Sequence, residues 1–105
     1  MSSETKTRIG NLLIDFGIAP SLLGFCYIIE AVEIYNMAKS ITKIYEEIAI
    51  KYNTNKVNVE RSIRSAFDKV NENARKTYFK GVAHKNAEFI SMLAWNEKER
   101  WLCKV

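Results

Sequence analysis

Residues 40–71 read SITKIYEEIAIKYNTNKVNVERSIRSAFDKVN, and this stretch decides the fold. Apolar side chains recur every three or four residues in two runs, which is the spacing of amphipathic helices. The first run comprises Ile41, Ile44, Tyr45, Ile48, Ala49 and Tyr52, and the second comprises Val59, Ile63, Ala66, Val70 and Ala74. The pattern predicts a helix-turn-helix over about residues 41–71, whose second helix covers about residues 55–71.

The link between the two predicted helices is Asn53-Thr54-Asn55, without Gly or Pro. Asn tolerates the left-handed backbone conformation better than most non-Gly residues, so Asn53 suits the turn. Thr54 or Asn55 can cap the next helix, because a side-chain oxygen there accepts a free backbone N–H. Ala49 lies four residues before Asn53, and its small side chain would let two crossing helices approach closely. We expect Ala49 to be buried at that crossing.

The outward face of the second predicted helix is charged. Steps of three and four residues place a strip opposite the apolar stripe, with Lys56 at its edge, formed by Val57, Glu60, Arg61, Arg64 and Asp68. In a helix that enters the DNA major groove, an Arg can donate two hydrogen bonds to guanine, and a Glu can accept one from cytosine. The other interpretation is a solvated helix face, on which Glu60 and Arg64 form an ordinary pair four residues apart.

Composition indicates a small helical domain. The 105 residues suffice for one domain with one core, and 48% hydrophobic with 27% charged residues is typical of a folded soluble chain. Four Gly and one Pro leave little material for turns, and no sustained alternation of apolar and polar residues indicates strands. We expect an all-α fold, a compact domain of five to six helices over residues 1–105.

Further helices are expected on both sides of the helix-turn-helix. The first covers about residues 5–16 and ends at Gly17. The second begins at Pro20 and forms the centre of the core, and within it we expect Cys26 to be a small buried residue. The last predicted helix is capped by Asn86.

Positive charge is concentrated in the second half of the chain. The net charge is +4, and residues 1–50 hold four Lys or Arg against six Asp or Glu, which gives −2. Residues 51–105 hold twelve against six, which gives +6. A basic half of this kind is the electrostatic footprint of a nucleic-acid-binding protein, and a mild excess of Lys that serves solubility would give the same total.

Other function classes find little support in the residues. The N-terminal MSSETKTR lacks the apolar core of a signal peptide, and the longest apolar run, 22–29, is far shorter than the roughly twenty residues that span a bilayer. We therefore expect a cytoplasmic protein without a membrane partner, with Cys26 and Cys103 reduced. His84 is the only His, and no catalytic or phosphate-binding pattern occurs, so we expect no enzyme activity, metal or cofactor.

The same residues resemble a known family, the C-terminal DNA-binding domain of the master sporulation-initiation response regulator of endospore-forming bacteria. The resemblance covers most of residues 9–94. Its blocks are SITK at 40–43, EIA at 47–49, KYNT at 51–54 and VERSIRSA at 59–66, with IDFGIAPSLLGFCYIIEA at 14–31 upstream and NAEFI at 86–90 downstream.

This resemblance implies roles for residues of the second helix. It implies base reading by Glu60, Arg61 and Val57, and contacts with the DNA backbone by Lys56, Asn58, Arg64 and Ser65. The chain departs from the family at Val57, Asn58 and Ser65, which replace Ser, Arg and His. Each change removes a polar or cationic contact and predicts lower affinity. Lys51 and Lys69, together with Lys56, are expected to compensate in part.

Two larger departures leave the biological role open. The family's domain follows an N-terminal receiver domain that this chain lacks, so the chain is either a fragment or a natural stand-alone regulator. The segment 71–85, which the family associates with RNA polymerase, is shorter here. The resemblance thus predicts a sequence-specific transcription regulator that binds double-stranded DNA. RNA polymerase, a related regulator or a second copy on tandem sites are further partners. The alternative is a protein-interaction module, or an antagonist that pairs with a full-length relative and binds DNA weakly or not at all.

Overall fold

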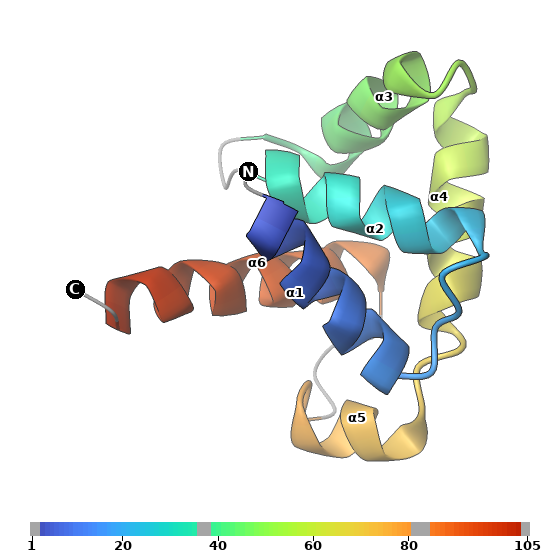
Figure 1. Cartoon of the computed structure of the whole chain (residues 1–105). Coiled ribbons are helices and arrows are strands. Elements are labelled where there is room, and N and C mark those ends of the chain that lie inside the picture. Colours follow the sequence, from blue (N-terminus) through green and yellow to red (C-terminus); the bar gives the residue numbers. More distant parts are fainter. Residues whose placement is uncertain (1–2, 36–38, 81–84, 104–105) are drawn as a thin grey trace.

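The computed structural model describes residues 3–35, 39–80 and 85–103, and within them it contains six helices and no strand (Figure 1). The helices are α1 (Ser3–Asp15), α2 (Leu23–Ile34), α3 (Ile41–Lys51), α4 (Lys56–Phe67), α5 (Glu72–Thr77) and α6 (Asn86–Cys103). The all-α prediction is confirmed. Across these same residues, no helix combines the length and the apolar character needed to cross a membrane. The expectations for His84 and for the Cys103 side chain lie outside what is described.

Helix α2 lies at the centre of the fold, where it packs against α1, α3, α4 and α6 (Figure 1). Its buried face repeats at helical spacing through Gly24, Tyr27, Ile28 and Ala31. Fully buried side chains from the surrounding helices, such as Leu13, Ile44, Ile63 and Phe89, complete one core cluster. Each large apolar side chain buried in this way contributes about 1.5–3 kcal/mol to folding.

Two predictions about α2 are wrong. The helix begins at Leu23 instead of Pro20, which lies in a preceding turn. Cys26 is exposed, and its thiol sulfur lies 3.1 Å from the Tyr52 hydroxyl oxygen. The physical reason is that α2 is apolar on more sides than it buries. Composition therefore could not identify which apolar residues face the core.

Helices α3 and α4 are joined by the tight turn that the sequence predicts. Asn53 has φ of 53°, in the left-handed region. The Thr54 N–H donates to the carbonyl oxygen of Ala49 at 2.9 Å. Asn55 caps α4, since its Oδ1 accepts the backbone N–H of Asn58 at 2.9 Å. The left-handed Asn and the cap are both confirmed.

Helix α4 ends at Phe67, earlier than the predicted end near Asn71. Asn71 instead caps the separate helix α5 by accepting the Ala74 N–H at 2.8 Å, so Ala74 does not belong to the second helix of the pair. Arg75 of α5 donates to the carbonyl oxygens of Phe67 at 2.8 Å and Val70 at 3.2 Å. The Phe67 carbonyl also accepts the Val70 N–H at 3.0 Å, so Arg75 adds a second donor there, and its positive charge is favourable near the negative C-terminal end of α4.

Helix α6 begins at Asn86. The Asn86 side chain does not cap this helix as expected, because it turns toward α4 and donates to the carbonyl oxygen of Glu60 at 3.0 Å. The carbonyl of Lys85 accepts the first helical hydrogen bond, from the Phe89 N–H at 3.0 Å. Phe89 then stacks on Phe67 with ring centroids 4.5 Å apart, which fixes α6 against α4.

Candidate DNA-binding surface

One face of α4 is turned to solvent and the opposite face is in the core. Val59, Ile63 and Ala66 are completely buried. The exposed residues of the helix include six of the seven that the resemblance associates with DNA, namely Lys56, Val57, Asn58, Arg61, Arg64 and Ser65. Glu60, the seventh, is half-buried between the two faces. The structure therefore brings the predicted site residues together on one exposed surface, the α4 strip.

Arg61 differs from the other cations of the α4 strip. It makes no hydrogen bond or ion pair with any residue that the structure describes. Arg64, in contrast, lies 3.0 Å from Glu60 through its Nη2, and the Lys56 Nζ lies 3.8 Å from the Glu46 carboxylate. Exposed pairs of this kind contribute about 0–1 kcal/mol, so phosphate groups can replace the carboxylates at little cost.

Asn58 is held at the first turn of α4. Its Nδ2 donates to the Thr54 hydroxyl at 3.1 Å while its backbone N–H is bound by the capping Asn55. These bonds fix the amide at the helix N-terminus, where backbone N–H groups and the positive end of the helix dipole favour a phosphate. Ser65 and Lys69 are exposed on the C-terminal side of the same surface.

Sequence reasoning missed a polar cluster that joins α2 to the end of α3. Glu30 is 7% exposed, and its Oε1 accepts from the Lys51 ammonium at 2.8 Å and the Tyr52 hydroxyl at 3.2 Å. Burial alone would raise the pKa of Glu30, but Lys51 and Tyr52 together hold it below its usual value. The hydrogen bond with Cys26, followed by burial, raises the pKa of Tyr52. The signal available in the sequence was Glu30, the charged residue that directly follows the apolar run 22–29.

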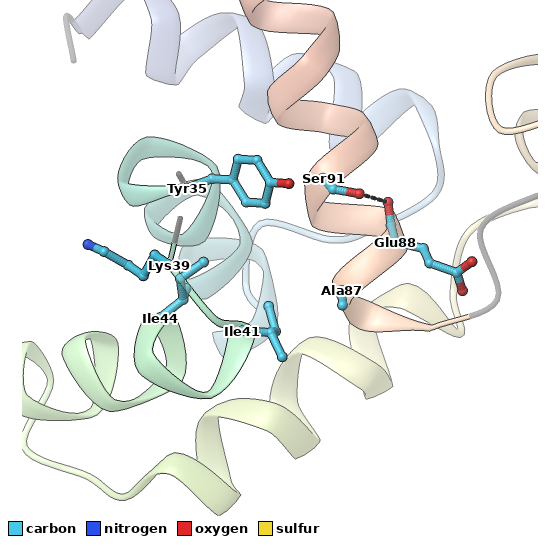
Figure 2. A pocket seen from close by; sticks show the side chains of 7 residues that line it. All are labelled: Tyr35, Lys39, Ile41, Ile44, Ala87, Glu88 and Ser91. Carbon is cyan, nitrogen blue, oxygen red and sulfur yellow. Dashed lines mark hydrogen bonds between the residues drawn. The ribbon is translucent and has the colours of Figure 1, made fainter. Parts of the chain in front are cut away.

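Two hollows flank the first turn of α6. The one on the α4 side has a volume of about 470 Å³ and is lined by Tyr45, Glu60, Arg64, Phe67, Asp68, Lys85, Asn86 and Ala87. The one on the α3 side has a volume of about 320 Å³ and is lined by Tyr35, Lys39, Ile41, Ile44, Ala87, Glu88 and Ser91 (Figure 2). Ala87 borders both hollows. The start of α6 thus lies next to both helices of the helix-turn-helix.

The chemistry that the α4 strip offers is hydrogen bonding and charge. Its guanidinium, amide, hydroxyl and carboxylate groups are those that contact bases and phosphates in protein–DNA complexes. Elsewhere in the described part of the chain, no three His, Cys, Asp or Glu side chains lie close enough together to hold a metal ion.

A comparison with known protein families identifies the fold. The model of the family described as "Sporulation initiation factor Spo0A C terminal" matches residues 9–96. The match runs from within α1 to within α6 and contains all of α3 and α4. It confirms the resemblance that the blocks KYNT, VERSIRSA and NAEFI indicate. The chain belongs to this family of DNA-binding domains that regulate transcription in sporulation.

Proposed function

We propose that the chain is a sequence-specific regulator that binds double-stranded DNA and inserts the N-terminal half of α4 into the major groove. In this arrangement base edges are read by Glu60, Arg61 and Val57, and the phosphate backbone is contacted by Lys56, Asn58, Arg64 and Ser65. This is a binding function and not a catalytic one. The six described helices share one core cluster, so we propose that they act as one domain.

The observation that carries this proposal is the exposed guanidinium of Arg61. Its guanidinium is exposed, it has no partner among the described residues, and it projects from a helix whose opposite face is fully buried. A guanidinium held in this way can donate two hydrogen bonds to a guanine without first breaking an ion pair. Because buried Val59 and Ile63 hold the helix, little ordering is required when DNA binds.

Selection of duplexes from a random-sequence pool tests the proposal. The selected duplex and an unselected duplex of equal length are then titrated with the chain over a range of salt concentrations. We expect tighter binding of the selected duplex. If about four to six phosphates are neutralised, log K should fall with log[salt] with a slope of roughly −4 to −5. Equal affinity for both duplexes would contradict sequence specificity, and a flat salt response would contradict the phosphate contacts.

A second candidate function is favoured by the ion pairs around the helix-turn-helix. Lys51, Lys56 and Arg64 each have a carboxylate partner within the chain, at 2.8, 3.8 and 3.0 Å. This internal neutralisation suits a module that pairs with a related regulator and binds DNA weakly. Size-exclusion chromatography of the chain mixed with a full-length relative, without DNA, would then give a complex.

The duplex titration also reports whether two copies bind tandem sites, through a stoichiometry of two chains per duplex.

A further inference from the structure

The first turn of α6 contains a buried amide whose partners lie on the helix-turn-helix. Asn86 is 7% exposed, whereas its neighbours Lys85 and Ala87 are exposed. A buried amide is unfavourable unless its polar atoms are hydrogen-bonded. The Nδ2 of Asn86 donates to the main-chain carbonyl oxygen of Glu60 at 3.0 Å, which satisfies this requirement and joins α6 to α4.

Asn86 also lies close to α3, since it and Tyr45 line the same hollow. The side chain of Tyr45 is largely buried, which raises the pKa of its hydroxyl, and a hydrogen bond with Asn86 acts in the opposite direction. A hydrogen bond that lowers the pKa of an acid is donated to its oxygen. The amide nitrogen has two hydrogens, so it can serve both Tyr45 and Glu60. One side chain of α6 therefore binds α4 and lies beside Tyr45 of α3.

We infer that Asn86 is a positioning residue for DNA recognition, which holds the Glu60 segment of α4 at a fixed height and rotation relative to α3. The inference rests on the proposed DNA-binding function. It assigns Asn86 an effect on base reading although its own side chain is buried beneath the α4 strip and requires no contact with DNA.

The hydrogen bond from Asn86 constrains the orientation of α4 in a way that apolar packing does not. Contacts of Val59 and Ile63 with the core are non-directional and allow small rotations and shifts of α4. A hydrogen bond to the Glu60 carbonyl is directional, and it acts at Glu60 and next to Arg61, two of the three residues proposed to read bases. Side chains that read bases must be held within about 0.5 Å of their binding positions. Supporting hydrogen bonds supply this precision together with packing.

Two hollows border the first turn of α6, which contains Asn86. The hollow of about 470 Å³ borders it on the α4 side, and the hollow of about 320 Å³ lies on the α3 side of the same turn (Figure 2). The hydrogen bond of Asn86 links the start of α6 to α4, and the Phe67–Phe89 stack reinforces this link further along.

The experiment compares Asn86→Leu and Asn86→Ala with the wild-type chain on the selected and the unselected duplex. Leu keeps the branched shape of Asn but removes the amide, and Ala serves as a second variant if the larger Leu side chain impairs folding. We expect about tenfold weaker binding of the selected duplex, less than about twofold change on the unselected duplex, and an unchanged salt slope. The reason is that the phosphate-contacting side chains are intact while the base-reading residues are displaced.

Asn96→Leu is the matched control, because it makes the same change in the same helix beside Tyr78 and not beside α4. It should leave the ratio of the two affinities unchanged. An equal loss on both duplexes in the Asn86 variants, or an effect no larger than that of Asn96→Leu, would overturn the inference. A wild-type chain without any preference would instead overturn the proposed function, and the inference with it.

A readout without DNA tests the hydrogen bond itself. The pKa of Tyr45 is followed by NMR of ring-labelled tyrosine in the wild-type chain and in Asn86→Leu. The pKa should be higher in the variant, because burial is kept and the opposing hydrogen bond is lost. An unchanged Tyr45 pKa would overturn the proposed link between α3, α4 and α6.

Discussion

Gly24 of α2 lies directly against the backbone of Ser62 on α4. A Cβ atom added at Gly24 would overlap the Ser62 carbonyl oxygen and lie 2.7 Å from the Cβ atom of Ala66. Glycine is the residue that permits this approach, because any side chain would separate the two helices. The placement of α4, and of the α4 strip with it, therefore depends on a residue that has no side chain.

Gly24→Ala should destabilise the domain by about 1–3 kcal/mol, because the methyl group forces α2 and α4 apart. Denaturant unfolding measures this loss, and duplex titration should show a weaker preference for the selected sequence. Gly10→Ala is the matched control. Its added Cβ would lie 3.4 Å from the Phe25 ring, and Ala stabilises a helix interior by roughly 0.5–1 kcal/mol relative to Gly. Equal stability of the two variants would contradict the close approach at Gly24.

Arg61→Ala should weaken binding to the selected duplex by about 1–3 kcal/mol and relax the preference at one base pair, because a bidentate guanine contact is lost. Thermal stability should hardly change, since Arg61 is exposed and has no partner among the described residues. Lys56→Ala is the comparison, and it should weaken selected and unselected duplexes alike. If Arg61→Ala leaves the ratio of the two affinities unchanged, the helix is docked in another orientation.

Ala49→Leu should reduce DNA binding although no residue of the α4 strip changes. Ala49 is buried in the core near the end of α3, a helix that packs on α4, and the larger side chain should overpack the core there by about 1–3 kcal/mol and tilt α4. Thermal unfolding and duplex titration are measured on the same preparation. Ile50→Leu, at the adjacent and largely exposed position, serves as the control and should leave both unchanged. Normal binding by a destabilised Ala49→Leu variant would show that α4 placement does not depend on this contact.

Glu30→Gln should make stability less sensitive to acid. The pKa of Glu30 is lower in the folded chain than its ordinary value of 4.5, so the unfolded chain takes up a proton first as pH falls. The stabilisation by the carboxylate is therefore complete above that ordinary value and is lost as pH falls through the folded-state pKa. Urea unfolding at about pH 7 and about pH 3 should show the variant less stable at the higher pH, with a smaller difference at the lower.

Glu72→Gln is the control for this pH dependence, because its carboxylate is 82% exposed in a surface pair with Lys76. It should follow the wild-type chain at both pH values. A gap between Glu30→Gln and the wild-type chain that does not change with pH would show that the carboxylate is not stabilised by its contacts with Lys51 and Tyr52.

The features that the sequence predicted well are those that depend on local preferences. The left-handed turn at Asn53 and the cap at Asn55 follow from what an Asn side chain and backbone can do, whatever surrounds them. The buried side of α4 follows from a strong helical period through Val59, Ile63 and Ala66. The DNA-reading roles of Glu60 and Arg61 follow from the resemblance to the family and stay predictions.

The features that the sequence could not indicate depend on partners far along the chain. Cys26 was expected in the core because α2 is apolar on nearly every side, and only the packing of its neighbours selects the buried one. Val70 and Ala74 continue the helical spacing of α4, yet the chain turns after Phe67, where Arg75 binds the Phe67 carbonyl. Asn86 has the residue type of a helix cap, but a carbonyl of α4 lies within its reach.

Three contacts that hold α4 in place all involve its main chain. Gly24 lies against the Ser62 backbone, Asn86 binds the Glu60 carbonyl, and Arg75 binds the Phe67 carbonyl. Main-chain atoms are the same whichever side chain a position carries. If the outward face of α4 reads DNA as proposed, substitutions there should alter the preferred DNA sequence one position at a time while the helix keeps its place. The way in which α4 is held would then be independent of the DNA sequence that it reads.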